Sequence, residues 1–149
     1  MTAEPVGRPM EILLVEDSLA DARLTIEALK EGGVQHRLTL VRDGLEAVEF
    51  LRRKEVFARA PRPDLILLDL ELPKMHGREV LTEIRSDVEL KDIPVVILTI
   101  SKDHEDILRN QGLHVESYLT KPVDMAKFVK VVKELRKVLA ADVMLPVME

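Results

Sequence analysis

The chain is 149 residues long, with 46% hydrophobic and 33% charged residues, a balance that predicts one globular domain with a single core rather than a disordered chain. It contains no cysteine, which excludes disulfides, thiolate metal sites and cysteine nucleophiles. The net charge of -5 and the scarcity of aromatic residues argue against a nucleic-acid partner, and no apolar run approaches the roughly 20 residues that cross a bilayer, so no membrane partner is expected either.

Short β-rich runs alternate along the chain with longer segments of helical periodicity. Four of the five runs are nearly unbroken hydrophobics, which is typical of strands buried on both faces of a parallel sheet. The predicted strands are residues 12–15, 38–41, 65–68, 95–98 and 115–119. We therefore expect strands and helices to alternate through one domain.

The first predicted helix follows strand 12–15. Ser18, followed three residues later by Asp21, resembles a capping box with Asp in place of Glu. Gly32 and Gly33 are expected to end the helix. Its buried face is predicted from spacings of three and four residues and consists of Leu19, Ala22, Ile26 and Leu29.

Two further helices are predicted on either side of the third strand. One runs from about residue 44 to 57 after an Asp43 cap, and the two prolines in 58–63 then break the chain. The other presents apolar side chains at helical spacing, namely Val80, Leu81, Ile84 and Val88.

The last two predicted helices flank the fifth strand. The segment 103–110 is short and weakly apolar, so it is the element that we expect to move. The final helix carries the stripe Met125, Phe128, Val132, Leu135 and Leu139, and a second stripe begins with Val131 and Val138. Five alternating strands and helices predict a doubly wound, flavodoxin-like α/β fold with a five-stranded parallel sheet in the order 2-1-3-4-5 and helices on both faces.

Reactive side chains follow the predicted strands at the point where each strand ends. Ligands of doubly wound folds bind beyond these carboxyl ends. The residues there are Glu16 and Asp17 after the first strand, Asp69 after the third, Thr99 after the fourth, and Lys121 and Pro122 after the fifth. In the order 2-1-3-4-5 the first and third strands are neighbours about 4.8 Å apart, so Asp17 and Asp69 come within reach of one ion.

Three carboxylates in one crevice repel one another unless a cation neutralises them. With oxygen ligands and no cysteine or paired histidine nearby, the expected ion is Mg²⁺, which keeps positions for phosphate oxygens. Asp69 would then be the nucleophile toward a phosphoryl group, while Lys121 neutralises the oxygens and Thr99 donates a hydrogen bond. Neither glycine-rich phosphate motif is present, so no nucleotide cofactor is expected.

These residues, in this order, resemble the receiver domain of two-component response regulators. The resemblance covers about 11–139 and is carried by Glu16-Asp17, Asp69 in LLDLELP, Pro73 and Gly77, Thr99 in ILT, Tyr118, and Lys121-Pro122. It implies that Glu16 and Asp17 form an acidic pocket. It also implies that Asp17, Asp69 and the backbone carbonyl of Glu71 ligate Mg²⁺.

The resemblance implies a function as well. Asp69 would accept a phosphoryl group from a sensor histidine kinase, in a signalling domain that promotes its own phosphorylation and dephosphorylation rather than in an enzyme. Thr99 would move toward the phosphoryl group while Tyr118 turns inward, which reshapes the face of helix four, strand five and helix five. A cis peptide is implied before Pro122.

Within that family the chain looks most like the single-domain response regulators paired with bacterial phytochromes, so a phytochrome kinase is an expected partner. Three segments carry this likeness: 55–63, 112–121 (GLHVESYLTK) and an apolar tail ending in Leu145-Pro146. Two positions depart from the usual pattern. Ile100 stands where a small residue usually follows the switch threonine, which narrows access to the phosphoryl group, and His76 replaces the usual acid before Gly77.

The chain divides into an N-terminal extension at 1–10, a receiver domain at 11–140 and an apolar C-terminal tail at 141–149. Residues 1–10 have no apolar stretch long enough for a signal peptide, so a cytoplasmic protein is expected. No output domain fits after the last predicted helix, so output must be a protein contact. The second stripe on that helix, with Val143, Leu145 and Val147 of the tail, predicts a homodimer through helix five and the tail.

Two other functions fit part of the sequence. A phosphatase with an aspartate nucleophile could use Asp69 and Glu71, although the nucleophile of that class follows the first strand of its sheet. An interaction domain with the same fold and no phosphorylation would not need the complete acidic set. The four histidines, His36, His76, His104 and His114, show no ligand spacing and are expected in loops or on the surface.

Overall fold

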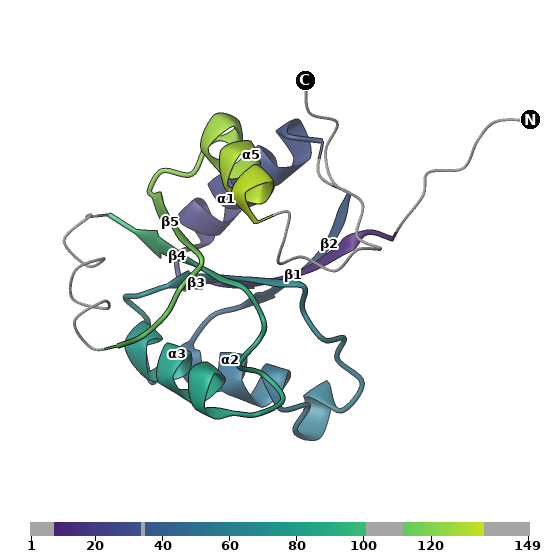
Figure 1. The fold of residues 1–149 in the computed structure, drawn as a ribbon, viewed down its shortest axis with the longest axis vertical. Coiled ribbons are helices and arrows are strands. Elements are labelled where there is room, and N and C mark those ends of the chain that lie inside the picture. Colours follow the sequence, from purple (N-terminus) through teal and green to yellow (C-terminus); the bar gives the residue numbers. More distant parts are fainter. Residues whose placement is uncertain (1–7, 34, 101–111, 136–149) are drawn as a thin grey trace, which may run out of the picture.

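The computed structural model describes residues 8–33, 35–100 and 112–135 (Figure 1). The strands are β1 (Met10–Val15), β2 (His36–Val41), β3 (Leu65–Asp69), β4 (Val95–Thr99) and β5 (Ser117–Thr120). The described α-helices are α1 (Leu19–Glu31), α2 (Gly44–Leu51), α3 (Gly77–Ser86) and α5 (Met125–Glu134), and η1 (Glu55–Phe57) is a 3₁₀ turn. The helix predicted at 103–110 lies outside the described residues.

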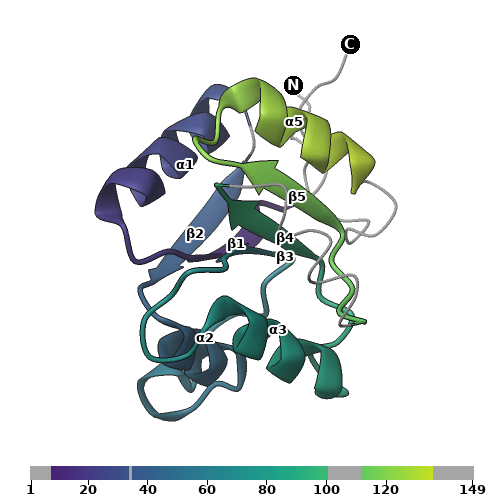
Figure 2. The ribbon, with the colours of Figure 1, turned by 90° about the vertical axis from the view of Figure 1, so that its left-hand side faces the viewer.

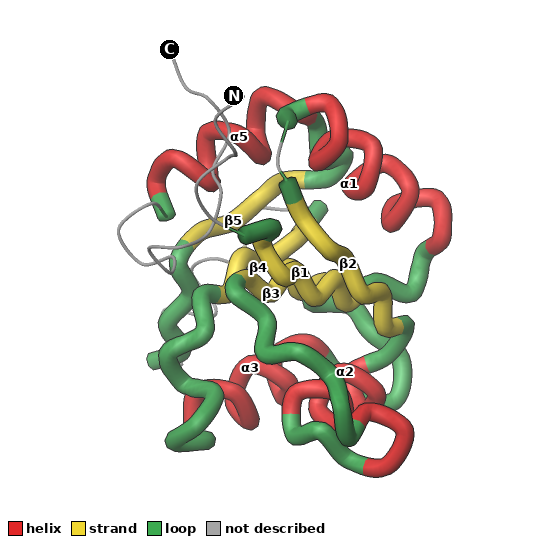
Figure 3. Tube along the Cα trace, turned by 90° about the vertical axis from the view of Figure 1, so that its right-hand side faces the viewer, coloured by secondary structure: helices red, strands yellow, loops and turns green. Residues whose placement is uncertain are grey.

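All five strands run parallel in one sheet, in the order β2-β1-β3-β4-β5. The helices α1 and α5 cover one face and α2 and α3 cover the other, as Figure 2 shows. Figure 3, taken from the side opposite to Figure 2, shows the same three layers. This confirms the predicted doubly wound fold, in which β1 and β3 are neighbours and their carboxyl ends open onto one crevice. None of the described helices has the length and apolar character of a membrane span.

The core consists of two apolar layers, one on each face of the sheet. Because successive side chains of a strand point to opposite faces, Leu14 and Leu67 pack toward α1 and α5. Leu13 and Ile66 pack toward α2 and α3 instead. Every residue of β3 and β4 is buried, which confirms that the central strands are covered on both faces.

The second helix is shorter than predicted. It ends at Leu51, and the chain then turns through Arg53 and Glu55, whose φ angles of 53° and 50° are left-handed. Phe57 packs edge-to-face on Phe50 with ring centroids 5.4 Å apart, which holds the turn against α2. The apolar pattern extends to Phe57 because that side chain returns to the core, but it does so through a 3₁₀ turn rather than a helix.

Three side chains of the predicted apolar helix faces are exposed. Leu19 and Met125 are 58% and 43% exposed because they are the first residues of α1 and α5, ahead of the face that each helix packs on the sheet. Val88 is 79% exposed because α3 ends at Ser86, before reaching it.

The fifth strand and the last helix also differ from the prediction. β5 begins at Ser117 rather than at 115. The Glu116 N–H still donates to the Val95 carbonyl at 3.0 Å, but the Val95 N–H donates to the Glu116 carboxylate at 2.6 Å. On α5, Val131 is 4% exposed and belongs to the core, so it is not part of an exposed second stripe. The rest of that stripe and the tail fall in 136–149, outside the described residues.

Candidate functional site

The carboxyl ends of the strands meet at one edge of the sheet, and the predicted site residues lie there. Asp69 and Thr99 are the last residues of β3 and β4. Glu16 and Asp17 directly follow β1, and Lys121 directly follows β5. Together they line a pocket of about 250 Å³, whose lining also includes Ser18, Asp21, Glu71 and Ile100.

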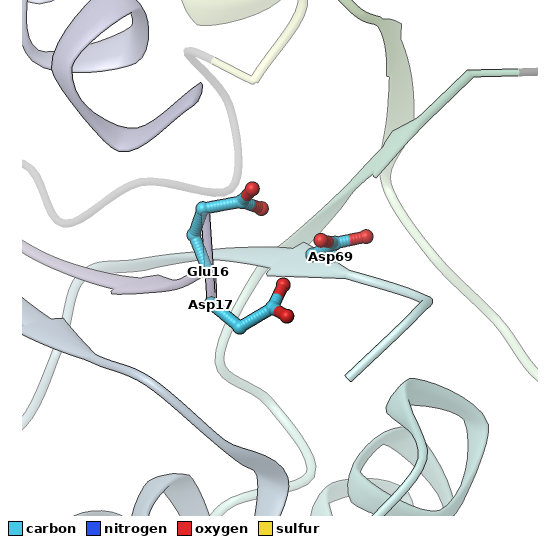
Figure 4. A group of neighbouring side chains, drawn as sticks. All are labelled: Glu16, Asp17 and Asp69. Atoms are coloured by element: carbon cyan, nitrogen blue, oxygen red, sulfur yellow. The ribbon is translucent and has the colours of Figure 1, made fainter. Parts of the chain in front are cut away.

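Three carboxylates converge in this pocket (Figure 4). Glu16, Asp17 and Asp69 each offer one carboxylate oxygen, and these oxygens lie within 4.8 Å of one another. Glu16 and Asp69 are only 1% and 5% exposed, whereas Asp17 is open to solvent. A set made only of oxygen ligands fits a hard divalent cation such as Mg²⁺.

The ammonium group of Lys121 lies among the carboxylates. Its Nζ donates to both carboxylate oxygens of Glu16 and to Asp69 Oδ2, each at 3.0 Å. Only 13% of the Lys121 side chain is exposed, so these charge-assisted bonds are largely shielded from water. The peptide bond between Lys121 and Pro122 is cis, which confirms the expectation from the resemblance.

The crowding of like charges changes the ionisation of the pocket. Burial, together with the hydrogen bond and charge of Asp69, raises the pKa of Glu16 from 4.5 to about 8, although Lys121 opposes the shift. Burial alone would lower the pKa of Lys121, but its hydrogen bonds to Glu16 and Asp69 and their charges raise it above its ordinary value. Lys121 is therefore charged at neutral pH, and added positive charge in the pocket would favour loss of the Glu16 proton.

The backbone around Asp69 holds its carboxylate in place. The Glu71 N–H donates to Asp69 Oδ1 at 3.0 Å. Gly77 opens α3 against this loop, and a Cβ at that position would come within 2.5 Å of the Asp69 carbonyl oxygen. Only glycine fits such a close approach of two backbones, which gives a physical reason for Gly77 in the motif.

Thr99 and Tyr118 lie on the side of the pocket away from β1. Thr99 is 4% exposed and lines the pocket at the end of β4. Tyr118 is half-buried in β5, pairs with Ile97 and packs against the apolar layer under α2 and α3. Ile100 follows Thr99 in the pocket lining and is 70% exposed. A movement of Thr99 or Tyr118 stays a prediction.

Two contacts of the pocket were not predicted from the sequence. Asp21 lies in the first turn of α1 and donates its N–H to Ser18 Oγ at 3.2 Å, as expected, but its carboxylate also accepts from Lys121 Nζ at 3.3 Å. Arg42, the first residue after β2, donates from Nη2 to the backbone carbonyl oxygen of Asp17 at 2.7 Å. Asp21 follows Asp17 by four residues and lies at the start of a helix. This spacing is the sequence signal from which its position beside the pocket could have been predicted.

The described histidines do not line the pocket. His36 begins β2, His76 is the N-cap of α3, and His114 lies 3.6 Å from Glu116. His104 is outside the described residues.

Residues 12–133 match the protein family described as "Response regulator receiver domain". The curated protein Response regulator Rcp1 of Synechocystis sp. (strain ATCC 27184 / PCC 6803 / Kazusa) is 47% identical over 138 residues. The match covers 93% of this chain and 94% of that protein.

Solved structures show the same similarity. The bacteriophytochrome response regulator RtBRR superposes with a TM-score of 0.82 at 37% identity, covering 95% of this chain and 82% of that one. The phosphorylated cyanobacterial phytochrome response regulator RcpA has a TM-score of 0.73 at 47% identity, covering 93% and 99%. The Mn(2+)-bound form of Rcp1 has a TM-score of 0.72 at 47% identity, covering 93% and 100%. These matches confirm the fold and the resemblance that the motif residues indicated.

Proposed function

Since this chain belongs to the response regulator receiver domain family and is related to phytochrome response regulators, we propose that Asp69 accepts a phosphoryl group from a sensor histidine kinase and that this changes a protein-interaction surface. The observation that carries the proposal is the position of the Asp69 carboxylate. It has an oxygen within 4.8 Å of oxygens of Glu16 and Asp17, and it lies 3.0 Å from Lys121 Nζ. The phosphorylated state of RcpA, a relative at 47% identity, supports it.

The acidic end of the pocket is assigned to Mg²⁺. The carboxylates of Asp17 and Asp69 and the backbone carbonyl of Glu71 would hold the ion, and Glu16 would add negative charge beside it. When bound, the ion supplies positive charge to the phosphoryl oxygens. The existence of a Mn(2+)-bound form of Rcp1, a relative at 47% identity, supports binding of a divalent cation by this protein.

The residues of the chain carry the transfer itself. A carboxylate oxygen of Asp69 attacks the phosphorus while the bond from phosphorus to the histidine nitrogen of the kinase breaks, which forms an aspartyl phosphate. Lys121 moves from the Asp69 carboxylate to a phosphoryl oxygen, and Thr99 donates a hydrogen bond to another. Water later attacks the phosphorus, releases phosphate and restores Asp69. The domain thus promotes its own phosphorylation and dephosphorylation without acting on a second substrate.

The hydrogen bond from Thr99 links the pocket to a surface. Thr99 moves toward the phosphoryl group, and Tyr118 on the neighbouring strand turns inward beside it. These movements reshape the face that contains β5 and α5, where a partner would bind. The likeness to RtBRR and RcpA favours a phytochrome as the kinase that supplies the phosphoryl group.

A homodimer through α5 and the tail is the proposed assembly. Val131 does not support it because that side chain is buried in the core. The proposal therefore rests on Val138 and on the apolar residues Val143, Leu145 and Val147 of the tail, which lie outside the described residues. Sedimentation at tens of micromolar protein, with and without beryllofluoride, tests it: a dimer in either state supports the assembly, and a monomer in both contradicts it.

Incubation with Mg²⁺ and acetyl phosphate tests the phosphoacceptor. We expect one phosphoryl group per chain, stable in acid and labile in alkali, on the wild type and not on Asp69→Asn. The matched control is Asp92→Asn, since Asp92 is exposed and does not line the pocket. Continued turnover of many phosphomonoesters would favour the aspartate-nucleophile phosphatase, and no adduct would favour an interaction domain without phosphorylation.

A further inference from the structure

Arg42 lies at the end of β2, next to the acidic pocket. It is the first residue after the strand, and its Nη2 donates to the backbone carbonyl oxygen of Asp17 at 2.7 Å. A guanidinium stays charged at any working pH, so this hydrogen bond is charge-assisted. We infer that Arg42 is a positioning residue that fixes the Asp17 backbone so that the Asp17 carboxylate can bind a divalent cation. This inference rests on the proposed function, in which Asp17 is a metal ligand.

Asp17 is the middle residue of the three-residue connection between β1 and α1. The Glu16 N–H still bonds to the Val41 carbonyl at 3.0 Å, in continuation of the β1–β2 pairing, and Ser18 is already the N-cap of α1. Among the described residues, the Asp17 carbonyl therefore takes its hydrogen bond from Arg42 rather than from the sheet or the helix. Asp17 is also the exposed member of the three carboxylates, so packing fixes it least.

The same turn contacts the loop that follows Asp69. Asp43 Oδ2 lies 3.6 Å from Lys74 Nζ. Gly44 packs so closely on Met75 that a Cβ on the glycine would lie 2.0 Å from the Met75 carbonyl oxygen. Residues 42–44 therefore connect the two halves of the proposed ligand set, one at the end of β1 and the other at the end of β3.

Arg42 has two effects on a cation in the pocket, and they have opposite signs. Its positive charge repels the ion, so loss of the charge alone would strengthen binding. Its hydrogen bond orders a ligand, and partners that orient metal ligands typically contribute about 10-fold to 100-fold in affinity. We expect the ordering effect to dominate because the Arg42 charge is exposed and screened by salt, whereas the bond to Asp17 is short.

Calorimetric titration of Mg²⁺ into the full chain tests this role. Arg42→Ala should bind Mg²⁺ about tenfold more weakly than the wild type, and Arg42→Lys, which keeps the charge but loses the planar fork, should fall between them. Arg37→Ala is the matched control, since Arg37 lies in β2, its side chain is 75% exposed, and its Nη1 lies 3.8 Å from Glu11 Oε1, away from Asp17. Its affinity should stay close to that of the wild type.

Phosphorylation kinetics separate positioning from chemistry. Arg42 does not line the pocket, so at saturating Mg²⁺ the rate of phosphorylation of Arg42→Ala by acetyl phosphate should equal that of the wild type. Only the Mg²⁺ concentration needed for half the maximal rate should rise.

The outcomes distinguish the two levels of the proposal. Mg²⁺ affinity of Arg42→Ala that equals or exceeds that of the wild type would overturn the role of Arg42. If Arg42→Ala does not fold, an unchanged affinity in Arg42→Lys would overturn it instead. Failure of the proposed metal site looks different, because the wild type would then bind no Mg²⁺ or Asp17→Asn would bind it as tightly as the wild type.

Discussion

Glu16 offers the sharpest single perturbation of the pocket, because burial and Asp69 raise its pKa from 4.5 to about 8. In the metal-free protein, the folded state keeps a proton on Glu16 over a pH range in which the unfolded chain has lost it. The stability that Glu16 contributes is therefore fully present below about pH 4.5 and is lost as the pH rises through about 8. Glu16→Gln removes this dependence while keeping a neutral side chain of the same shape.

The size of the effect follows from the two pKa values. Each unit of difference corresponds to about 1.4 kcal/mol. A rise from 4.5 to about 8 therefore sets an upper limit on the order of 5 kcal/mol for the stability lost at alkaline pH.

Urea unfolding in EDTA, followed by circular dichroism at several values between pH 5 and pH 8, measures the effect. At each pH, the free energy of unfolding of Glu16→Gln is subtracted from that of the wild type, which removes the contribution of groups that titrate alike in both proteins. We expect the wild type to lose several kcal/mol of unfolding free energy relative to Glu16→Gln as the pH rises from 5 to 8. Adding Mg²⁺ at pH 8 should restore the stability of the wild type. Parallel pH profiles for the two proteins in EDTA would refute the reasoning.

Three further predictions concern other residues. Lys121→Met should slow phosphorylation by acetyl phosphate at saturating Mg²⁺ about 100-fold, because the phosphoryl oxygens lose a cation; mass spectrometry of the adduct over time measures this, and an unchanged rate would show that Lys121 is not used. Ile100→Ala should speed the same reaction several-fold, since it removes a side chain from the lining of the pocket, whereas an equal rate would show that Ile100 does not restrict access. Glu116→Ala should lower the free energy of unfolding by about 1–3 kcal/mol, because Arg85 Nη2 and the Val95 N–H bond to Glu116 Oε2 at 3.0 and 2.6 Å. Urea unfolding of Glu116→Ala that coincides with the wild type would contradict this.

The fold and the members of the site could be predicted from the sequence for one shared reason. Strands buried on both faces must be continuous hydrophobics, and in β3 and β4 the apolar run stops at Asp69 and Thr99. The same change in hydropathy therefore located both the strand and the reactive residue at its end. The parallel order of the strands predicted that Asp17 lies beside Asp69, and in the structure their carboxylate oxygens lie within 4.8 Å of one another.

Contacts between distant elements could not be predicted in the same way, because they depend on how the chain is packed. Asp21 and Lys121 are 100 positions apart, and nothing in local periodicity joins them. The role of Arg42 depends on the direction of one side chain after β2. The predicted end of the second helix was wrong because Phe57 returns to the core through a 3₁₀ turn and not through a helix. The exposure expected for Val131 was wrong because α5 packs against α1 as well as against the sheet.

Phosphotransfer from a purified, autophosphorylated sensor kinase tests most directly whether Asp69 is the acceptor. A candidate phytochrome kinase carrying labelled phosphate is mixed with the wild type, Asp69→Asn and Asp92→Asn in the presence of Mg²⁺. We predict that the label moves to the wild type and to Asp92→Asn but not to Asp69→Asn. Label on Asp69→Asn at the level of the wild type would contradict the assignment of the phosphoacceptor.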